Sequence, residues 1–279
     1  EYILGFCYTQ LYDVEQEVNG QKVMVPQVYL ASNSKNAVIT GGSLVAANNV
    51  SITAGAATNS GSTIRGNNLS MLADNINNAG GGVLTGGAVQ LAAAQDIRNS
   101  GSTISGNNVT LAAGRDIVSE ARIVGGNGVT RLGETGGIAA ADGLQMLAGR
   151  DVTLAGSRLA AGGDARVSAG RDVNVTTVTT GSSFHGYHLD EDITTHHGSS
   201  VVVGGNLQMT AGNDLTVAGS GVAAGGDATL AAGRNLSVTA VQDVFKQEIR
   251  GSSSNGLLGS SSSRRNEERV TSKAATVTA

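Results

Sequence analysis

Hydrophobic and polar residues alternate along most of this chain with a period of two. The segments Leu207-Gln208-Met209, Leu215-Thr216-Val217 and Val173-Asn174-Val175 show the pattern in its simplest form. A period of two is typical of a β-strand that buries one face and exposes the other, and no helical period competes with it. We therefore expect an all-β protein built from short strands.

The alternating segments recur as variants of one unit of about twenty residues. Ile76 and Ile97 occupy the same place in the unit 21 residues apart, Ile97 and Ile117 are 20 apart, and Leu215 and Leu236 are again 21 apart. Between the strands stand Gly-Asn-Asn, Gly-Gly-Asp and Ala-Gly-Arg-Asp, whose residues tolerate the backbone of sharp corners. The unit thus indicates strand, corner, strand, corner.

A unit of this size cannot bury its own apolar face, so successive copies must stack, each strand pairing with its equivalent one repeat later. This arrangement predicts a right-handed parallel β-helix, also called a β-solenoid, with β-hairpins projecting from it. Residues 41–240 hold roughly nine coils, which at ~4.8 Å per coil form a rod ~45 Å long.

Several segments do not follow the repeat, and their positions indicate how the chain is divided. We expect an N-terminal β extension or cap in residues 1–40, ahead of the β-helix repeats in 41–240. Within the repeats, 118–137 is an irregular insertion and 176–199 is a projecting hairpin. Residues 241–279 form a second projecting hairpin or a flexible tail.

The N-terminal segment carries longer and more mixed strands than the repeats. Tyr2 to Tyr8 and Lys22 to Leu30 have strand character, and Asn19-Gly20 is typical of a tight hairpin turn. These strands are expected to extend or cover the first coil.

The amino-acid composition limits which side chains can fill the core. The chain has 41 Gly, 3 Phe, 5 Tyr and no Trp, so the core must be thin and made of layers of Val, Leu, Ile and Ala. Gly follows no three-residue period and there is a single Pro, which excludes a collagen-like triple helix. Charged residues make up only 14%, too few for a chain that is disordered over most of its length.

Charge and cysteine content narrow the possible partners. The net charge of −4 argues against nucleic acid as a partner, because phosphate backbones bind through clustered Lys and Arg. Cys7 is the single cysteine, so it cannot form an intramolecular disulfide or a cysteine-based metal site. No apolar run approaches the ~18 residues of a membrane span. Glu1 is not followed by a signal-peptide pattern, so we expect an interior fragment of a longer chain.

The repeats resemble a known family. The chain is similar to the filamentous haemagglutinin repeats of large two-partner-secreted bacterial proteins, which include adhesins and contact-dependent growth inhibition toxins. Four units carry the resemblance, which extends over essentially the whole chain: Asn107 to Ile117, Gly143 to Ser157, Gly162 to Val175 and Gly204 to Ser220.

The resemblance implies a structural segment of a secreted protein at the bacterial cell surface. It also implies, for the parent protein, an outer-membrane secretion partner and a cell-surface receptor. The secretion domain and toxin modules of the family have no counterpart in this sequence, so their activities are not carried over.

One segment gathers all four histidines and several acids into a single projection. Imidazole and carboxylate groups are zinc or nickel ligands, and a hairpin could bring His185 or His188 opposite His196 or His197. The alternative is a solvated hairpin whose polar residues prevent aggregation of an exposed strand pair. We assign no metal, no cofactor and no catalytic residue. We predict a partner-binding loop formed by His185, Tyr187, His188, Asp190, Glu191, Asp192, His196 and His197.

The remaining alternatives concern the rod. The Arg-Asp corners, such as Arg115-Asp116 and Arg171-Asp172, are interpreted as structural pairs rather than an anion-binding strip. For the whole chain we favour a stalk that does not act as an enzyme and expect a monomeric rod. A receptor-binding module acting through the projecting hairpins is the alternative. A polysaccharide lyase or hydrolase is less favoured, because the acids are spread one per corner.

Overall fold

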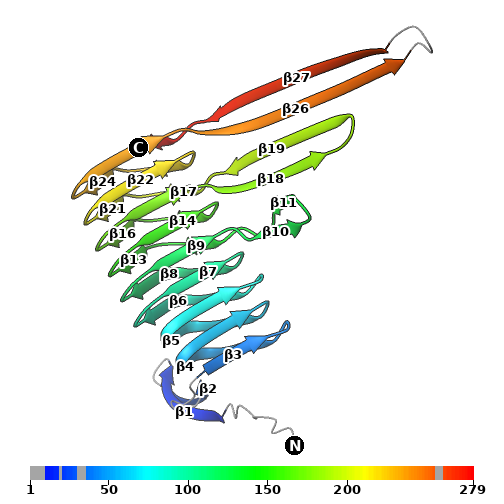
Figure 1. Ribbon diagram of the computed structural model, residues 1–279. Helices are drawn as coiled ribbons and strands as arrows, with labels where there is room; N and C mark the ends of the chain where they lie inside the picture. Colours follow the sequence, from blue (N-terminus) through cyan, green and yellow to red (C-terminus); the bar gives the residue numbers. More distant parts are fainter. Residues whose placement is uncertain (1–9, 19–20, 30–35, 255–259) are drawn as a thin grey trace, which may run out of the picture.

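The structure, a computed structural model, describes residues 10–18, 21–29, 36–254 and 260–279. These residues form strands and turns without a helix, and most of the strands stack into one parallel β-helix (Figure 1). A separate antiparallel sheet projects from its side. The predicted all-β parallel β-helix with projecting hairpins is confirmed. In the described part of the chain, no helix is long and apolar enough to cross a membrane.

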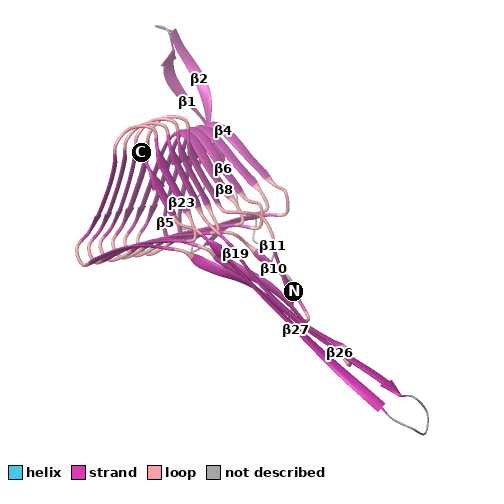
Figure 2. Ribbon diagram, turned by 90° about the horizontal axis from the view of Figure 1, so that it is seen from above, coloured by secondary structure: helices cyan, strands magenta, loops and turns pink. Residues whose placement is uncertain are grey.

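Each coil has three sides, and the coils superpose as a triangle when viewed along the rod (Figure 2). The coil formed by β12 (Gly137–Ala140), β13 (Leu144–Ala148) and β14 (Val152–Ala155) shows the unit clearly. The sequence pattern indicated only two strands and two corners per unit, and this expectation was wrong. In the first coils, β4 (Leu44–Ser60) and β5 (Thr63–Ala79) run unbroken along all three sides.

Eight complete coils lie between Leu44 and Thr239, with a partial coil at each end. The partial coils are formed by β3 (Asn36–Thr40) and β28 (Thr276–Thr278), which pair in parallel with β4 and β23. The other strands of the rod are β6 (Val83–Ala93), β7 (Ile97–Ser100), β8 (Thr103–Ala113), β9 (Ile117–Glu120), β15 (Arg158–Ala161), β16 (Ala165–Ala169), β17 (Val173–Thr176), β20 (Ser200–Val203), β21 (Leu207–Ala211), β22 (Asp214–Ala218), β23 (Gly221–Ala224), β24 (Ala228–Ala232) and β25 (Asn235–Thr239).

The core consists of aliphatic side chains stacked one above another in register. On the side of the triangle that holds β12, every complete coil after the first contributes one fully buried aliphatic residue, and each pairs with its equivalent in the next coil. A buried Val, Leu or Ile side chain contributes roughly 1.5–3 kcal/mol, so each coil adds a similar increment. The members of this stack are Ile64, Leu84, Ile104, Ile138, Leu159, Val201 and Val222.

The corner that the sequence pattern missed is a Gly-Ser step between the third strand of one coil and the first strand of the next. Gly61, Gly101, Gly156 and Gly219 have φ between +52° and +62°, a conformation that favours glycine. After Gly61, Gly101 and Gly219, the serine Oγ accepts a hydrogen bond from a backbone N–H of the preceding turn of the rod. Ser199 N–H, for example, donates to Ser220 Oγ at 3.0 Å.

The Arg-Asp corners pair between adjacent coils. Arg171 binds Asp151 of the preceding coil through Nε and Nη2, and Arg234 binds Asp214 in the same way. The hydrogen bond from Arg234 lowers the pKa of Asp214 to about 2. The arginine side chains of these pairs are 50% and 65% exposed, so each pair contributes modestly, but the pairs recur along one corner.

The N-terminal strands β1 (Gln10–Val18) and β2 (Gln21–Tyr29) form an antiparallel hairpin. β2 also pairs in parallel with β4 over Gln27–Tyr29, which attaches the hairpin to the rod. The strand predicted from Tyr2 to Tyr8 and the turn predicted at Asn19-Gly20 lie outside the described residues.

Candidate functional site: the side sheet

Three β-hairpins leave the rod and join into one six-stranded antiparallel sheet, called here the side sheet (Figure 1). The segment expected to be an irregular insertion, 118–137, contains the first of these hairpins. In spatial order the strands are β10 (Ile123–Gly126), β11 (Val129–Leu132), β18 (Val178–His185), β19 (Leu189–His197), β26 (Val241–Ser254) and β27 (Ser260–Lys273).

All three hairpins leave the same corner, the one that is otherwise closed by Gly-Ser. They follow β9, β17 and β25, and a coil with the short corner lies between each two of them. Two coils rise ~9.6 Å, and the two strands of one hairpin also occupy ~9.6 Å across a sheet. Successive hairpins therefore arrive at the spacing at which their edge strands can hydrogen-bond.

Contacts between the hairpins are strongest where β19 meets β26. The two strands pair antiparallel from Leu189–Thr194 to Val244–Ile249. On one face of the sheet, Arg250 binds both Asp190 and Glu248, and Arg264 binds Glu248 with 2.6 Å between Nη2 and Oε2. The first hairpin is attached more weakly, through one residue pair between β11 and β18.

The residues of the predicted partner-binding loop divide into three groups: at the tip of the second hairpin, at its base, and in contact with the third hairpin. His185, Tyr187 and Asp192 lie at or near the tip of the second hairpin and are exposed, Tyr187 to 83%. His185 lies 3.7 Å from both Asp190 and Asp192, measured between ring nitrogens and carboxylate oxygens.

His196 and His197 lie instead at the base of the second hairpin. His196 Nδ1 is 3.1 Å from Asp243 Oδ1 on the third hairpin, and His197 Nε2 is 2.8 Å from Thr180 Oγ1. Burial raises the pKa of Asp243, but hydrogen bonds from the backbone and ring of His196 outweigh it, so the pKa is lowered. The contact of His196 with Asp243 joins the second and third hairpins, whereas the contact of His197 with Thr180 lies within the second hairpin.

The strand register rules out the histidine pairing considered for a metal site. His185 lies opposite Asp190, and His196 lies opposite Thr179. His188 points toward the third hairpin, where its Nδ1 is 3.0 Å from the carbonyl oxygen of Arg250. Among the described residues, no group of three His, Cys, Asp or Glu side chains has the geometry to hold a metal ion.

Of the other predicted residues, Asp190 and Glu191 take part in contacts between the second and third hairpins. Gln247 donates a 3.2 Å hydrogen bond to Glu191, while Asp190 is bound by Arg250. The sequence did not reveal these partners, because residues about 60 positions apart meet only when the hairpins align.

Sequence reasoning also missed Phe184, which is 58% exposed near the same tip as Tyr187. Large exposed aromatic side chains on a projecting hairpin favour partner contact. The signal was available in the sequence, since Phe184 is one of only 3 Phe in the chain.

One shallow groove on the charged face of the side sheet gathers several acids, the feature that would favour a glycan-cleaving enzyme. It is lined by His185, Asp190, Asp192, Lys246, Gln247, Glu248, Asn266, Glu267 and Glu268. Hydrogen bonds from Arg264 and Arg250 lower the pKa of Glu248. A glycosidase needs a carboxyl that stays protonated as general acid, so Glu248 has the opposite tendency.

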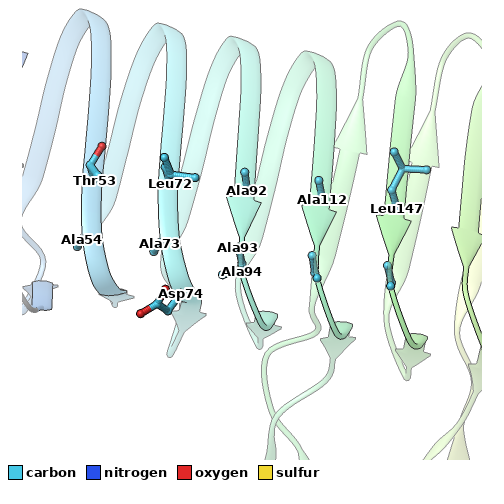
Figure 3. A pocket seen from close by; sticks show the side chains of 14 residues that line it. Thr53, Ala54, Leu72, Ala73, Asp74, Ala92, Ala93, Ala94, Ala112 and Leu147 are labelled. Atoms are coloured by element: carbon cyan, nitrogen blue, oxygen red, sulfur yellow. The ribbon is translucent and has the colours of Figure 1, made fainter.

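A second groove, of about 620 Å³, follows the outer surface of the rod (Figure 3). Leu72, Ala92, Ala112 and Leu147 point outward from successive coils along it. Its lining is almost entirely apolar, without the few converging polar groups that orient a small ligand.

The hemagglutinin repeat family model matches residues 73–122, 125–190 and 181–279, and so spans most of the rod and nearly all of the three hairpins. The chain belongs to the hemagglutinin repeat family. The predicted resemblance is confirmed, and nearly all of the side sheet lies within hemagglutinin repeat sequence. No solved structure is a significant match to the chain.

Curated relatives of this hemagglutinin repeat chain are CdiA proteins. A tRNA nuclease CdiA of Yersinia mollaretii is 31% identical over 228 residues, which is 72% of this chain and 8% of that protein. A 16S rRNA endonuclease CdiA of Enterobacter cloacae is 34% identical over 154 residues, 51% of this chain and 5% of that protein. A tRNA nuclease CdiA of Escherichia coli O6:K15:H31 is 35% identical over 174 residues, 57% of this chain and 5% of that protein. The chain thus spans less than a tenth of these relatives.

Proposed function

We propose that this chain is a stalk segment of a large two-partner-secreted protein that is exported to the bacterial cell surface and holds a binding or toxin region away from it. An outer-membrane secretion partner and a cell-surface receptor are the partners that this role implies for the parent protein. The observation that carries the proposal is the stack of coils, in which successive inner coils bury equivalent aliphatic positions.

The electrostatics support a structural rather than a catalytic role. The acids of the repeating corners are bound by arginines of the next coil, and Glu248 on the side sheet is bound by two arginines. Such pairing orients the carboxylates toward the protein and lowers the pKa of Asp214 and Glu248, whereas acid–base catalysis needs a proton available to a substrate.

A chimera tests the stalk role. In the Yersinia mollaretii relative, this chain replaces the stretch to which it is similar, and delivery of the tRNA nuclease to neighbouring cells is measured. A spacer tolerates the exchange, so delivery is expected to persist. The matched control carries Val167→Asp, which buries an unpaired carboxylate in the fully buried core and is expected to abolish delivery. A folded chimera at the cell surface that fails to deliver would contradict a pure spacer.

The exposed aromatic pair Phe184 and Tyr187 supports a second role, in which the tip of the side sheet contacts a receptor. Replacing both residues by serine should then reduce cell binding at least tenfold without changing secretion, because exposed aromatic anchors dominate many interfaces. Thr229→Ser, on the outer surface of the rod, is the control. Unchanged cell binding by the aromatic variant would remove this role.

A further inference from the structure

The apolar groove along the outer surface of the rod lies on the side of the triangle that holds β13. All three hairpins of the side sheet leave the corner between the third strand of one coil and the first strand of the next. That corner is opposite the β13 side, so the side sheet leaves the groove uncovered (Figure 2). The groove is therefore a face of the rod that another molecule can reach.

One column of outward residues runs along the groove, and each member is in register with its neighbour in the next coil. The leucines of this column are ridges, since Leu72 is 55% exposed and Leu147 is 36% exposed. The two alanines between them form a recess two coils wide (Figure 3). From the first coil to the fifth, the column reads Thr53, Leu72, Ala92, Ala112 and Leu147.

The outward side chains of the strands on this face are uncharged in the first five coils. They are Ser51, Thr53, Ser70, Leu72, Gln90, Ala92, Thr110, Ala112, Gln145 and Leu147. The first charged one is Arg166, in the sixth coil. Protein interfaces are depleted of charge at their centre, and exposed apolar patches mark contact surfaces. The pattern favours contact with another apolar protein surface.

A second copy of this face fits the column when its rod runs antiparallel. A twofold axis along the strands at Ala92 sets Leu72 opposite Ala112 of the second copy and Leu147 opposite its Thr53, and both contacts occur twice. Every ridge then faces a smaller residue, as the interdigitated side chains of packed sheets require. An axis midway between Ala92 and Ala112 would instead set Leu72 against Leu147, so that the ridges collide. The face is therefore complementary to itself when the two copies are displaced by one coil.

Charges at the rim of the groove match in the same arrangement. Asp74 is the one charged residue that lines the groove, and it lies opposite Gly114 of the second copy, next to Arg115. Arg115 binds Asp96 through Nε and Nη2 and has further N–H donors free, since a guanidinium carries five. Opposite charges thus meet at two symmetry-related places, which favours this orientation of the copies.

The size of the contact indicates a reversible dimer. The five residues of β13 span about 16 Å and five coils rise about 24 Å, so each copy covers roughly 400 Å² and the pair roughly 800 Å². Stable complexes bury about 1,200–2,000 Å², and smaller contacts are typical of transient ones. The copies are therefore expected to associate and separate readily.

We propose that this face of the rod is a self-association surface, at which a second copy of this chain lies antiparallel and places its leucine ridges in the alanine recess. The contact is isologous, the usual geometry of a homodimer. A spacer does not require such a contact, so the proposal goes beyond the stalk role. The monomeric rod expected from the sequence is then the dissociated state.

Two variants of the whole chain that exchange ridges and recess test the fit. Leu72→Ala with Leu147→Ala removes the ridges, and Ala92→Leu with Ala112→Leu fills the recess. Each variant alone is expected to weaken self-association, measured by analytical ultracentrifugation, by about tenfold or more. The filled variant does so although it exposes more apolar surface, because leucine then meets leucine. Mixed in equal amounts, the two variants set large residues on small ones again, and association is expected to return.

A matched control places the same side chains on another side of the rod. Ala139 and Ala160 point outward from adjacent coils on the β12 side, so Ala139→Leu with Ala160→Leu is expected not to weaken association. Far-UV circular dichroism confirms that each variant is folded. A parent chain that stays monomeric up to millimolar concentration, a filled variant that associates more tightly than the parent, or a mixture that fails to associate would each overturn the proposal. A monomeric parent that floats with phosphatidylglycerol vesicles would assign the groove to a lipid surface instead.

Discussion

A buried stack of asparagines in the first half of the rod supports a quantitative prediction about the core. Asn59, Asn78 and Asn99 stack on one another, each 1% exposed, and each side-chain amide donates to the next at 2.8 Å. The same position in later coils holds Leu154 and Val175, both fully buried. The rod therefore uses a polar stack and an apolar stack at one position of the unit.

Asn78→Leu should destabilise the first coils by about 2–3 kcal/mol. The substitution removes two amide–amide hydrogen bonds, each worth about 1 kcal/mol, and it leaves Asn99 Oδ1 buried without its donor, which costs about 1–3 kcal/mol. Asn59 Nδ2 keeps the carbonyl of Ser62 at 2.9 Å, so its loss is smaller. Burial of the leucine methyl groups offsets part of the total.

Replacing all three asparagines by leucine should cost less than the sum of the single substitutions. No amide then remains unpaired, and the orphaned Asn59 Oδ1, which has no partner among the described residues, disappears as well. The carbonyls of Ser62 and Gly82 still accept backbone N–H groups at 2.8 Å and 2.9 Å.

Urea unfolding followed by circular dichroism gives the total, and amide hydrogen exchange locates the change, because stacked repeats need not unfold as one unit. A triple variant that loses as much stability as the three single variants together would refute the reasoning.

Three further outcomes are expected. Gly156→Ala should lower thermal stability more than Gly42→Ala, because both have positive φ but a Cβ at Gly156 would lie 2.6 Å from Val178 Cγ2, whereas Gly42 has open space; equal losses would contradict this. The pair of Asp214 with Arg234 should stabilise the fold above the ordinary carboxyl pKa of 3.8, and this effect should be lost as pH falls toward about 2. Arg234→Gln should therefore reduce the dependence of the free energy of unfolding on pH in this range. An unchanged pH dependence would count against the pairing. Arg171→Ala should lower thermal stability only slightly, since the Arg171 side chain is half exposed, and a loss as large as that of Gly156→Ala would contradict this.

The rod could be predicted from the sequence because its determinants are local and repeated. Alternation fixes which side chains face inward, and a constant unit length fixes parallel pairing, so Ile76, Ile97 and Ile117 fall into one stack. The third corner escaped notice because a Gly-Ser step is short. In the early coils, it also joins polar segments such as Asn59-Ser60, where the buried side chain is itself an asparagine.

The side sheet could not be predicted in the same way. Each hairpin has strand character in isolation, but the pairing of β19 with β26 depends on two coils of rod placing them side by side. Sequence reasoning therefore gathered the histidines by proximity along the chain. The strand register separates His185 from His196, and contacts from the third hairpin engage His188 and Asp190.

From β9 onward, a hairpin leaves the rod at every second coil, and a Gly-Ser corner closes the coil between. This alternation limits how many coils can be added to such a protein without breaking the side sheet. Between two hairpins, duplication of a pair of coils adds room for one new hairpin and leaves the rest of the side sheet continuous. Duplication of a single coil would move neighbouring hairpins apart by an extra ~4.8 Å, the width of one strand. Their edge strands would then be too far apart for direct backbone hydrogen bonds, and the gap would be too narrow for another hairpin. Length variants of this region are therefore expected to differ by even numbers of coils wherever the side sheet is retained.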